Sequence, residues 1–560
     1  MIDIRLIHGY HNKKNRCLSS ISDTFPCIFR REDVTVQTVG LLMERIIFHI
    51  DVNSAFLSWE ACYRIHHLGG TLDLRTIPSA VGGDQSKRHG IILTKSIPAK
   101  KYHIKTGEPI VDARRKCPDL VIVPPNYTLY SHASRAMIEI LEEYTDTIEK
   151  YSIDEAFLDM TGTPWLQDRA LLLRHTASAQ PMRHAATSDV SPSTLVATLG
   201  SASANASAAH VVPGLSSSPS DRQRATGSMS ALSDRIRAFD AIRLPAEIDA
   251  TWQSEVEHRA VLLAWQLKER IREALGFTVN IGISSNKLLA KMASDFQKPD
   301  QVHTLWPSEI EHKMWPLPVE DLFYVGYATA PKLHRLGIHT IGALAQFDPD
   351  MLYHRMKSHG LLVRQFACGI DDSPVIPQLM EAPPKGYGNS CTTIHDVTDR
   401  QEAYWHLLSL AETVSQRIRA DEVRISCVDI SIRDSELRFY GHQKQLRSPT
   451  DLTLEIYDAA CRCFDELWTG YPIRHLGIHT SKVSHAVGRQ VDLFDRYDYG
   501  KLRQAECAVD EIRTRYGNDA IKRARFVSAP DCADPYAIDH MNGGISRERR
   551  TVDYHKENIS

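Results

Sequence analysis

The chain has 560 residues, which at roughly 150 residues per domain corresponds to about 3.7 domains and excludes a single small module. Its 42% apolar and 24% charged residues exclude a wholly disordered, collagenous or membrane-embedded protein. Lys and Arg number 66 against 69 Asp and Glu, a formal net charge of −3, so a nucleic-acid partner would have to be held by local basic patches.

Cysteine usage and hydropathy indicate the compartment. The 11 cysteines are odd in number and scattered, with Cys461 and Cys463 as the only close pair, so neither a disulfide framework nor a CxxC zinc site fits. No stretch approaches the roughly 18–20 apolar residues of a membrane span, and the first 20 residues lack a signal-peptide core. These features predict a reduced, cytoplasmic protein with no membrane partner.

The first half of the chain has an alternating strand and helix pattern. Residues 1–42 have no sustained period and are expected to form a loose extension, and the functional chain is expected to start at Met43. The apolar run 46–50 predicts a buried strand, after which Ser54 is expected to cap a helix ending near residue 67. Short strands are predicted at 90–94 and 120–123, a helix over about 130–144, and a hairpin over 148–160.

A segment of unusual composition interrupts this pattern. Residues 176–230 contain 29 Ser, Ala and Thr in 55 positions and no aromatic residue, too little apolar area to offset the entropy of ordering. We expect a disordered insertion spanning about residues 165–240, whose ends lie close together because strand and helix patterns resume beyond it.

Regular elements return after the insertion. A helix is predicted to end at Leu275 with Gly276 as its stop, followed by a strand at 278–283 and a helix to 296 that places Lys287 and Lys291 on one face. A smaller helical region extends to about residue 368, and the Pro-rich stretch 381–385 is typical of a linker. Residues 386–485 predict the order helix, strand, strand, helix, strand, and residues 505–527 a basic amphipathic helix.

Three acidic residues lie at the ends of apolar β segments. Asp51 follows the strand 46–50, and Asp154 and Glu155 occupy the tip of the predicted hairpin. Buried or clustered carboxylates require a counter-charge, which a pair of divalent cations supplies in phosphoryl transfer. Ordinary solvated turn acids fit the spacing equally well, so spacing alone leaves both interpretations open.

Longer motifs around these acids favour the metal-binding interpretation over ordinary solvated turn acids. The string Asp-Val-Asn-Ser-Ala-Phe at 51–56 and the string Ser-Ile-Asp-Glu-Ala-Phe-Leu-Asp at 152–159 resemble the two catalytic motifs of the Y-family translesion DNA polymerases, also called the ImpB/MucB/SamB family. The resemblance continues through residues 282–294 and Lys298-Pro299, and covers about residues 43–495 apart from the insertion. It implies an α+β, right-hand polymerase with a palm, small fingers, a helical thumb and a little-finger sheet domain.

The resemblance also implies roles for individual residues. Asp51, Asp154 and Glu155 would be catalytic and would hold two Mg²⁺ ions together with the Val52 carbonyl, with Mn²⁺ able to substitute. The amides of Asn53, Ser54, Ala55 and Phe56 lie at a strand-to-helix turn, where unpaired N–H groups and the helix dipole favour phosphates. In the absence of the motif, Phe56 would be interpreted as a core residue of an amphipathic helix; with it, Phe56 resembles the steric gate that excludes a ribose 2′-hydroxyl.

Two lysines are expected to contact the nucleotide. Lys291 matches the family lysine that reaches the triphosphate, although a lone helix lysine is more often simply solvated. The fingers motif departs from the family, because Ile97 and Lys100 stand where Tyr and Arg often contact the phosphates. Lys100 can replace the arginine charge but not its bidentate fork, so weaker or altered nucleotide contacts are expected.

Three further regions resemble DNA- or clamp-binding parts of the family. Residues 322–340 resemble a helix-hairpin-helix whose turn, around Gly326 and Gly337, presents amides to DNA phosphates, although Tyr324 and Ala328 replace common glycines. An ordinary helix pair packed through Leu333, Leu336 and Ile338 is compatible with the same pattern.

Residues 386–485 would grip duplex DNA, although the same pattern also fits an ordinary solvated sheet face. The residues that would do so are Arg424, Arg433, Arg438, Lys444 and Arg447. Gln490, Leu493 and Phe494 belong to a pentapeptide that resembles the sliding-clamp-binding motif, though a random tail match is the alternative.

The domain boundaries expected from these motifs are palm and fingers at 43–305 (fingers about 54–124), thumb at 306–375, little finger at 386–485, and a clamp-binding peptide, helix and polar tail at 486–560. The expected function is error-prone translesion synthesis in DNA repair: nucleotidyl transfer from dNTPs to a primer 3′-hydroxyl on primer-template DNA. The expected protein is a monomer that binds the β sliding clamp and lies with the bacterial nucleoid. The alternatives are a clamp-tethered, weakly active or inactive accessory protein and a palm-type nucleotide cyclase.

Overall fold

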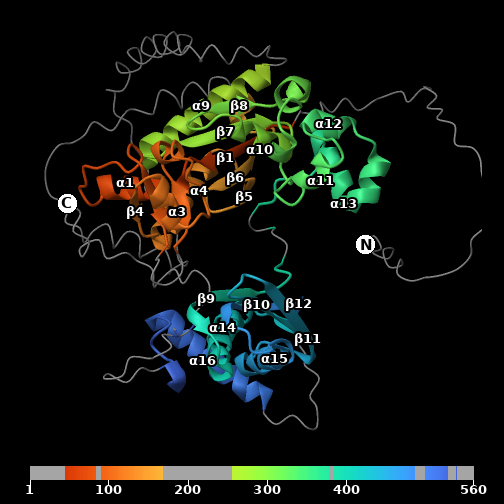
Figure 1. Ribbon diagram of the computed structural model, residues 1–560. Helices are drawn as coiled ribbons and strands as arrows, with labels where there is room; N and C mark the ends of the chain where they lie inside the picture. The colour runs from red at the N-terminus through yellow and green to blue at the C-terminus, as the bar shows by residue number, and fades with distance from the viewer. Residues whose placement is uncertain are drawn as a thin grey trace, which may run out of the picture. The chain divides into compact units, whose positions relative to one another are not determined.

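The computed structural model describes residues 45–83, 90–167, 255–377, 380, 383–485, 498–526, 538 and 541 (Figure 1). The expected extension 1–42, nearly all of the expected insertion 165–240, and the peptide containing Gln490, Leu493 and Phe494 lie outside the described residues. Across the part that is described, no helix is long and apolar enough to cross a membrane.

A five-stranded sheet organises the first half of the described chain. Its order is β5-β6-β1-β7-β8, with antiparallel pairing except between β7 and β8, which are parallel. The predicted strand 46–50, hairpin 148–160 and strand 278–283 are confirmed. The strands are β1 (Ile47–Val52), β5 (Ile148–Lys150), β6 (Glu155–Asp159), β7 (Val279–Ser284) and β8 (Val302–Thr304).

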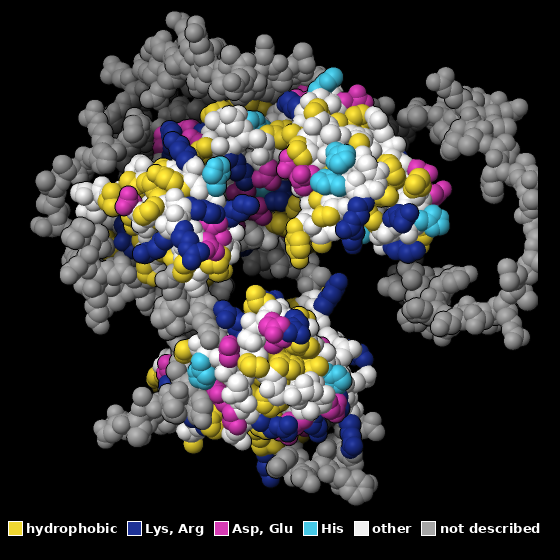
Figure 2. All heavy atoms as spheres, viewed as in Figure 1, with side chains coloured by type: hydrophobic (Ala, Val, Ile, Leu, Met, Phe, Trp, Pro, Cys, Tyr) yellow, Lys and Arg dark blue, Asp and Glu magenta, His cyan; other side chains and the backbone are white. Residues whose placement is uncertain are grey.

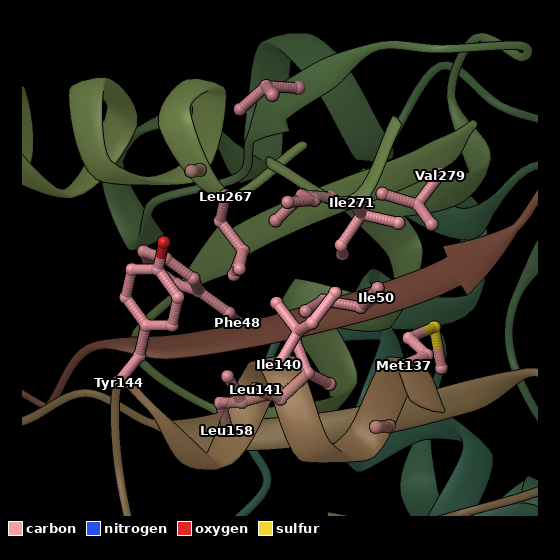
Figure 3. Packing of buried hydrophobic residues seen from close by; sticks show 14 of the residues in the cluster. Phe48, Ile50, Met137, Ile140, Leu141, Tyr144, Leu158, Leu267, Ile271 and Val279 are labelled. Atoms are coloured by element: carbon pink, nitrogen blue, oxygen red, sulfur yellow. The ribbon is translucent and has the colours of Figure 1, made fainter. Parts of the chain in front are cut away.

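Helices cover both faces of this sheet. On one face, alternate residues of β1, β6 and β7 pack against α4 and α9, as Figure 3 shows for Phe48, Leu158, Met137 and Leu267. On the other face α10 contacts β7 and β1. The helix of Leu275 ends as predicted at Gly276, whose φ is +77°. The helices are α1 (Ala55–His66), α4 (Tyr127–Glu142), α5 (Pro164–Gln167), α9 (Glu255–Leu275) and α10 (Lys287–Asp295).

Gly282 allows α10 to lie directly on the sheet. A Cβ atom at this position would come within 1.9 Å of the Ala290 carbonyl oxygen and 2.4 Å of the Ser294 amide nitrogen. Both atoms belong to the backbone of α10, which cannot move aside as a flexible side chain could. Glycine is therefore the residue that this contact requires.

A small three-stranded sheet with the order β3-β2-β4 follows α1 in the chain. The strands predicted at 90–94 and 120–123 are confirmed, whereas β2 was not predicted. Ile97, Pro98, Ala99 and Lys100 form a single helical turn, α2. The elements are β2 (Ser79–Gly82), β3 (Ile92–Lys95), α2 (Ile97–Lys100), α3 (Ile110–Lys116) and β4 (Val121–Val123).

Several helices follow β8, in agreement with the predicted helical region. Leu333 and Ile338 are buried in their common core and Leu336 packs against it, as expected for the helix pair. The elements are η2 (Pro307–Glu309), the π-helical turn η3 (Ile310–Met314), η4 (Val319–Asp321), α11 (Ala330–His334), α12 (Ile341–Gln346) and α13 (Pro349–Ala367).

The C-terminal sheet has the order β11-β10-β12-β9, and every pairing is antiparallel. The prediction that this region starts with a helix was wrong: it starts with β9, whose inward positions include the polar Asn389 and Thr393, so no apolar alternation marked it. The helix predicted at 505–527 lies earlier in the chain than expected: α16 begins at Tyr499 and ends at Tyr516, just before Gly517, whose φ is +91°. The elements are β9 (Gly388–Val397), α14 (Arg400–Ala420), β10 (Arg424–Asp434), β11 (Phe439–Thr450), α15 (Thr453–Leu467), β12 (Ile473–Ser484), α16 (Tyr499–Tyr516) and η6 (Ala524–Phe526).

We expect Gly282→Ala to lower the free energy of unfolding by about 2–3 kcal/mol, because the added methyl group overpacks a backbone-to-backbone contact. Gly441→Ala is the matched control, since its Cβ would meet its nearest neighbour at 3.6 Å, and it should change stability by less than about 0.5 kcal/mol. Chemical denaturation of both variants measures this difference. Equal stability of the two would contradict the close approach of α10.

Candidate active site

The strand register brings two of the three predicted acids together. Asp51 and Glu155 are Cα partners in the antiparallel pair of β1 and β6, so their side chains project from adjacent positions. Asp154 precedes β6, and its carbonyl accepts a hydrogen bond from the Val52 amide at 3.1 Å. The three carboxylates, which the sequence separates by about 100 positions, thus meet at one end of the β1–β6 pair.

Asp51 is paired with a lysine to which the sequence analysis gave no role. Its Oδ2 lies 2.6 Å from Lys298 Nζ, which also lies 2.7 Å from Asp295 Oδ1. Burial raises the pKa of Asp51 to about 6, the Lys298 charge opposes that shift, and the Glu155 and Asp295 charges add to it. Lys298 is therefore part of the electrostatics of the site. The only sequence signal for it was its place in the Lys-Pro pair of the motif.

Glu155 is paired with Lys291. Its Oε1 lies 2.6 Å from Lys291 Nζ, which also lies over the rings of Tyr151 and Phe323 at 5.5 and 5.3 Å from their centroids. The Lys291 side chain is 10% exposed, so these partners surround it. The motif predicts that Lys291 reaches the triphosphate; in the structure its ammonium instead contacts the carboxylate of Glu155.

Asp154 is oriented by its own turn. The Ser152 hydroxyl donates to Asp154 Oδ1 at 2.7 Å and accepts from the Asp154 amide at 3.3 Å. No lysine or arginine lies within ion-pair distance of Asp154 in the described ranges, in contrast to Asp51 and Glu155. Asp154 is therefore the acid held by neutral donors alone.

The turn between β1 and α1 differs in detail from the expectation. Ser54 occupies the N-cap position of α1 as predicted, but it takes left-handed angles (φ 49°, ψ 50°) and its side chain makes no capping hydrogen bond. The Asn53 amide donates to the Thr278 carbonyl at 3.0 Å, so this N–H already has a hydrogen-bond acceptor within the protein. The amides of Ser54, Ala55 and Phe56 lie in the first turn of α1, where no intrahelical acceptor exists.

Phe56 lies in an aromatic cluster. Its ring stacks on Tyr130 with centroids 4.5 Å apart and planes at 8°, while Trp59 and Tyr127 flank it at about 6 Å. The Tyr130 hydroxyl donates to the buried Glu60 carboxylate at 3.0 Å, which fixes the supporting ring. Phe56 therefore has a defined orientation at the edge of the core.

A cavity of about 540 Å³ lies beside two of the three acids. It is lined by Asp51, Asp154, Phe56 and the β1–α1 turn, and by residues 93–97 and Lys100 of the small sheet. Glu155 and Lys291 do not line it. Its wall contains Lys100, for which the sequence predicts a nucleotide contact, and also Lys298, Arg75 and Lys95, for which the sequence predicts no role.

The two glycines expected to bind duplex DNA in the thumb are exposed and lie on either side of α11, Gly326 before it and Gly337 after it. Gly337 has a φ of +78°, in the left-handed region, whereas Gly326 has no positive φ. Tyr324, at a position where glycine is common, nevertheless adopts a φ of +72°, and its ring contacts Phe323 and Phe366 edge-on at 4.7 and 5.5 Å. These ring contacts offset the strain of a bulky residue at positive φ.

The basic residues expected to grip DNA in the C-terminal sheet do not share one face. Lys444 pairs with Val428, a core residue, and its ammonium contacts Glu466 of α15. Arg433 follows the buried Ile432 and is exposed on the opposite face.

Two other arginines of this set have partners of their own. Arg438 contacts the carboxylates of Glu436 and Asp434, and Arg424 lies over the Tyr499 ring at 5.4 Å. Figure 2 shows basic and acidic side chains interspersed on the visible surface, in keeping with the near-zero net charge.

The donor set at the acids consists of oxygen atoms. Within the ranges that the structure describes, no group of three or more His, Cys, Asp or Glu side chains converges as a ready-made metal site. The carboxylates of Asp51, Asp154 and Glu155 and the Val52 carbonyl are nevertheless hard oxygen donors of the type that Mg²⁺ prefers. Two of the acids, Asp51 and Glu155, contact lysine ammonium groups in this structure. The residues therefore fit Mg²⁺ by the type of their donor atoms and by their closeness to one another.

Comparisons with known proteins agree with these motifs. The sequence models of the impB/mucB/samB family, of its C-terminal domain and of its HHH motif match residues 50–295, 384–493 and 307–338. DNA polymerase IV of Clostridium acetobutylicum is 35% identical over 86% of this chain and 98% of its own, and DNA polymerase IV 1 of Bacillus subtilis is 31% identical over 86% and 92%. A solved Y-family DNA polymerase chimera shares the fold, with a TM-score of 0.52 and 16% identity over 78% of this chain and 99% of its own.

We expect Lys291→Met to lower stability by about 3 kcal/mol, because Glu155 would be left partly buried without its counter-charge. The double variant Lys291→Met/Glu155→Gln should recover part of this loss, giving a coupling energy of about 1–3 kcal/mol. Thermal or chemical unfolding of the wild type, the single variants Lys291→Met and Glu155→Gln, and the double variant measures this coupling energy. Strictly additive losses would show that the pair is not formed.

Proposed function

Because this chain belongs to the impB/mucB/samB family of Y-family DNA polymerases and is a DNA-directed DNA polymerase, we propose that it carries out error-prone translesion synthesis. Its substrates would be dNTPs and primer-template DNA. The observation that carries the proposal is the pairing of Asp51 with Glu155, next to Asp154, at a cavity whose wall contains Phe56.

We propose Asp51, Asp154, Glu155 and the Val52 carbonyl as the ligands of two divalent ions, Mg²⁺ or in its place Mn²⁺. Such ions would supply Lewis-acid stabilisation of the attacking and leaving oxygens. The protein contributes the orientation of the acids: the β1–β6 register fixes Asp51 and Glu155, and the Ser152 hydroxyl fixes Asp154. Lys298, in the cavity wall, would bind a phosphate oxygen of the nucleotide. Lys100 and the amides of Ser54, Ala55 and Phe56 would bind phosphate oxygens as well.

Lys291 and Asn53 take modified roles in this proposal. Lys291 would hold the Glu155 carboxylate in place, since its ammonium contacts that carboxylate and two rings. Asn53 would hold the turn, since its side chain joins Asn280, Thr278 and the Asp300 amide. Both would therefore act through neighbouring groups and not on the nucleotide itself.

For DNA we propose contacts from the turns at Gly326 and Gly337 and from Arg433, Arg424, Arg438 and Lys444. Phosphate contacts of this kind bind any sequence and weaken with salt. The exposure of Arg433 supports a direct contact, whereas Lys444 would first have to leave Glu466. The assigned domains remain palm and fingers at 43–305, thumb at 306–375 and little finger at 386–485.

We also propose that Gln490, Leu493 and Phe494 bind the sliding clamp. The chain before them ends in β12, and the chain after them continues in α16, where Glu506 and Asp510 pair with Arg419 of α14. The peptide is thus bounded on both sides by elements of one sheet-and-helix unit. We propose that the protein acts as a monomer in the bacterial cytoplasm, on the nucleoid.

Primer extension by the purified protein tests the chemistry. With Mg²⁺ and dNTPs we expect extension on intact and abasic templates, and a loss of at least about 1,000-fold in Asp51→Asn, which removes a ligand charge. Asp119→Asn is the matched control, because Asp119 is exposed and outside the cavity, and it should extend normally. DNA binding by the wild type without extension would instead favour the accessory-protein alternative.

Phe56→Val should weaken sugar discrimination. Removing a steric clash of about 1–3 kcal/mol with a 2′-hydroxyl should raise the ratio of ribonucleotide to deoxyribonucleotide incorporation by about 5-fold to 150-fold. Single-nucleotide kinetics with dNTP and NTP measures the ratio. Phe439→Val, an exposed phenylalanine outside the cavity, should leave it unchanged. An unchanged ratio in Phe56→Val would remove Phe56 from the gate role.

A further inference from the structure

The cavity has four cationic side chains in its wall, and they differ in how they are neutralised. Arg75 pairs with Asp73 at 2.9 Å and donates to the Gly276 carbonyl at 2.7 Å. Lys298 pairs with Asp51 and Asp295. Lys95 and Lys100 have no carboxylate within ion-pair distance among the residues that the structure describes. Two of the four lining cations are therefore neutralised within the protein and two are not.

Lys95 ends strand β3 and is held at the cavity. Its ammonium donates to the Thr106 hydroxyl at 3.2 Å, and Thr106 lines the same cavity. Burial lowers the pKa of Lys95, and the nearby Lys100 charge lowers it further. The acid that opposes this shift, Glu108, is itself paired with Lys116 at 2.6 Å. Within the described ranges, Lys95 thus stands near a like charge and has a neutral hydroxyl as its hydrogen-bond partner.

The backbone between the two lysines is fixed by Ser96. The Ser96 hydroxyl accepts from the amides of Ala99 and Ser79, both at 3.1 Å, and donates to the Ile77 carbonyl at 2.7 Å. The Ser96 amide donates in turn to the Ser79 carbonyl at 2.9 Å. The side chains of Lys95 and Lys100 therefore start from fixed points on β3 and α2. A bound anion need not order the backbone that carries them.

We propose that Lys95 is a second cationic contact to the polyphosphate of the incoming nucleotide, acting together with Lys100. Ile97 offers no donor, and Lys100 supplies a point charge without the geometry of a guanidinium. A second ammonium on the same wall makes up the missing charge, and a polyanion bound between the two lysines relieves their mutual repulsion. The inference rests on the proposed polymerase function and deepens it by naming a residue that binds its substrate.

Kinetics with Lys95→Met tests this assignment, because methionine keeps most of the stem and removes the charge. We expect the KM for dNTP to rise about tenfold with a smaller change in kcat, and Lys95→Arg to restore most of the affinity. Lys101→Met is the matched control: Lys101 is exposed and does not line the cavity, so its KM should stay at the wild-type value. A KM unchanged in Lys95→Met, or a weakened DNA affinity with an unchanged KM, would overturn the assignment.

A binding measurement separates this inference from the polymerase function. Titration of the full chain with inorganic tripolyphosphate in the presence of Mg²⁺ should show weaker binding by Lys95→Met than by the wild type or Lys101→Met. Weaker binding by Lys95→Met in a protein that extends no primer would support Lys95 as a polyphosphate contact and refute translesion synthesis as the function. Normal primer extension with equal tripolyphosphate affinity in all three proteins would refute the inference alone.

Discussion

The site depends on one pairing: Asp51 lies directly across from Glu155 in the β1–β6 ladder. Like charges at opposed positions of an antiparallel pair repel each other, so the strands can hold both carboxylates only with cations nearby. Lys291 and Lys298 supply these charges, and both come from α10 and the residues just after it. The close approach of α10 at Gly282 is therefore an electrostatic requirement as well as a packing one.

The sequence predicted the parts of this arrangement that follow from local pattern. The apolar run before Asp51 and the hairpin that carries Asp154 and Glu155 were predicted because strand periodicity is local and the acids interrupt it. The ion pairs were not, because Lys291 and Lys298 lie 136 and 247 positions from their acids and no spacing rule links them. The strand β9 was missed for a related reason, since polar Asn389 and Thr393 are buried on its inner face.

The small sheet shows how one substitution in a motif is understood only in its surroundings. From sequence, Ile97 meant a lost hydroxyl and weaker nucleotide contacts. In the structure Ile97 begins the turn α2, whose geometry the Ser96 hydroxyl holds, and a lysine precedes that serine on β3. Lys95 was not considered, because a lysine at a strand end is ordinarily solvated and its place in the wall of the cavity follows from tertiary structure alone.

The use of lysine at these positions is itself informative. An arginine would bind a carboxylate through two parallel hydrogen bonds and would be hard to displace. An ammonium on a flexible stem makes a single short contact, as Lys298 does with Asp51, and can exchange a carboxylate for a phosphate oxygen. In the proposed function Asp51 must take a divalent cation in place of a lysine, while its partner Lys298, in the cavity wall, takes a polyanion. A lysine partner allows both exchanges, because the ammonium and the carboxylate each gain a new partner of opposite charge as they separate.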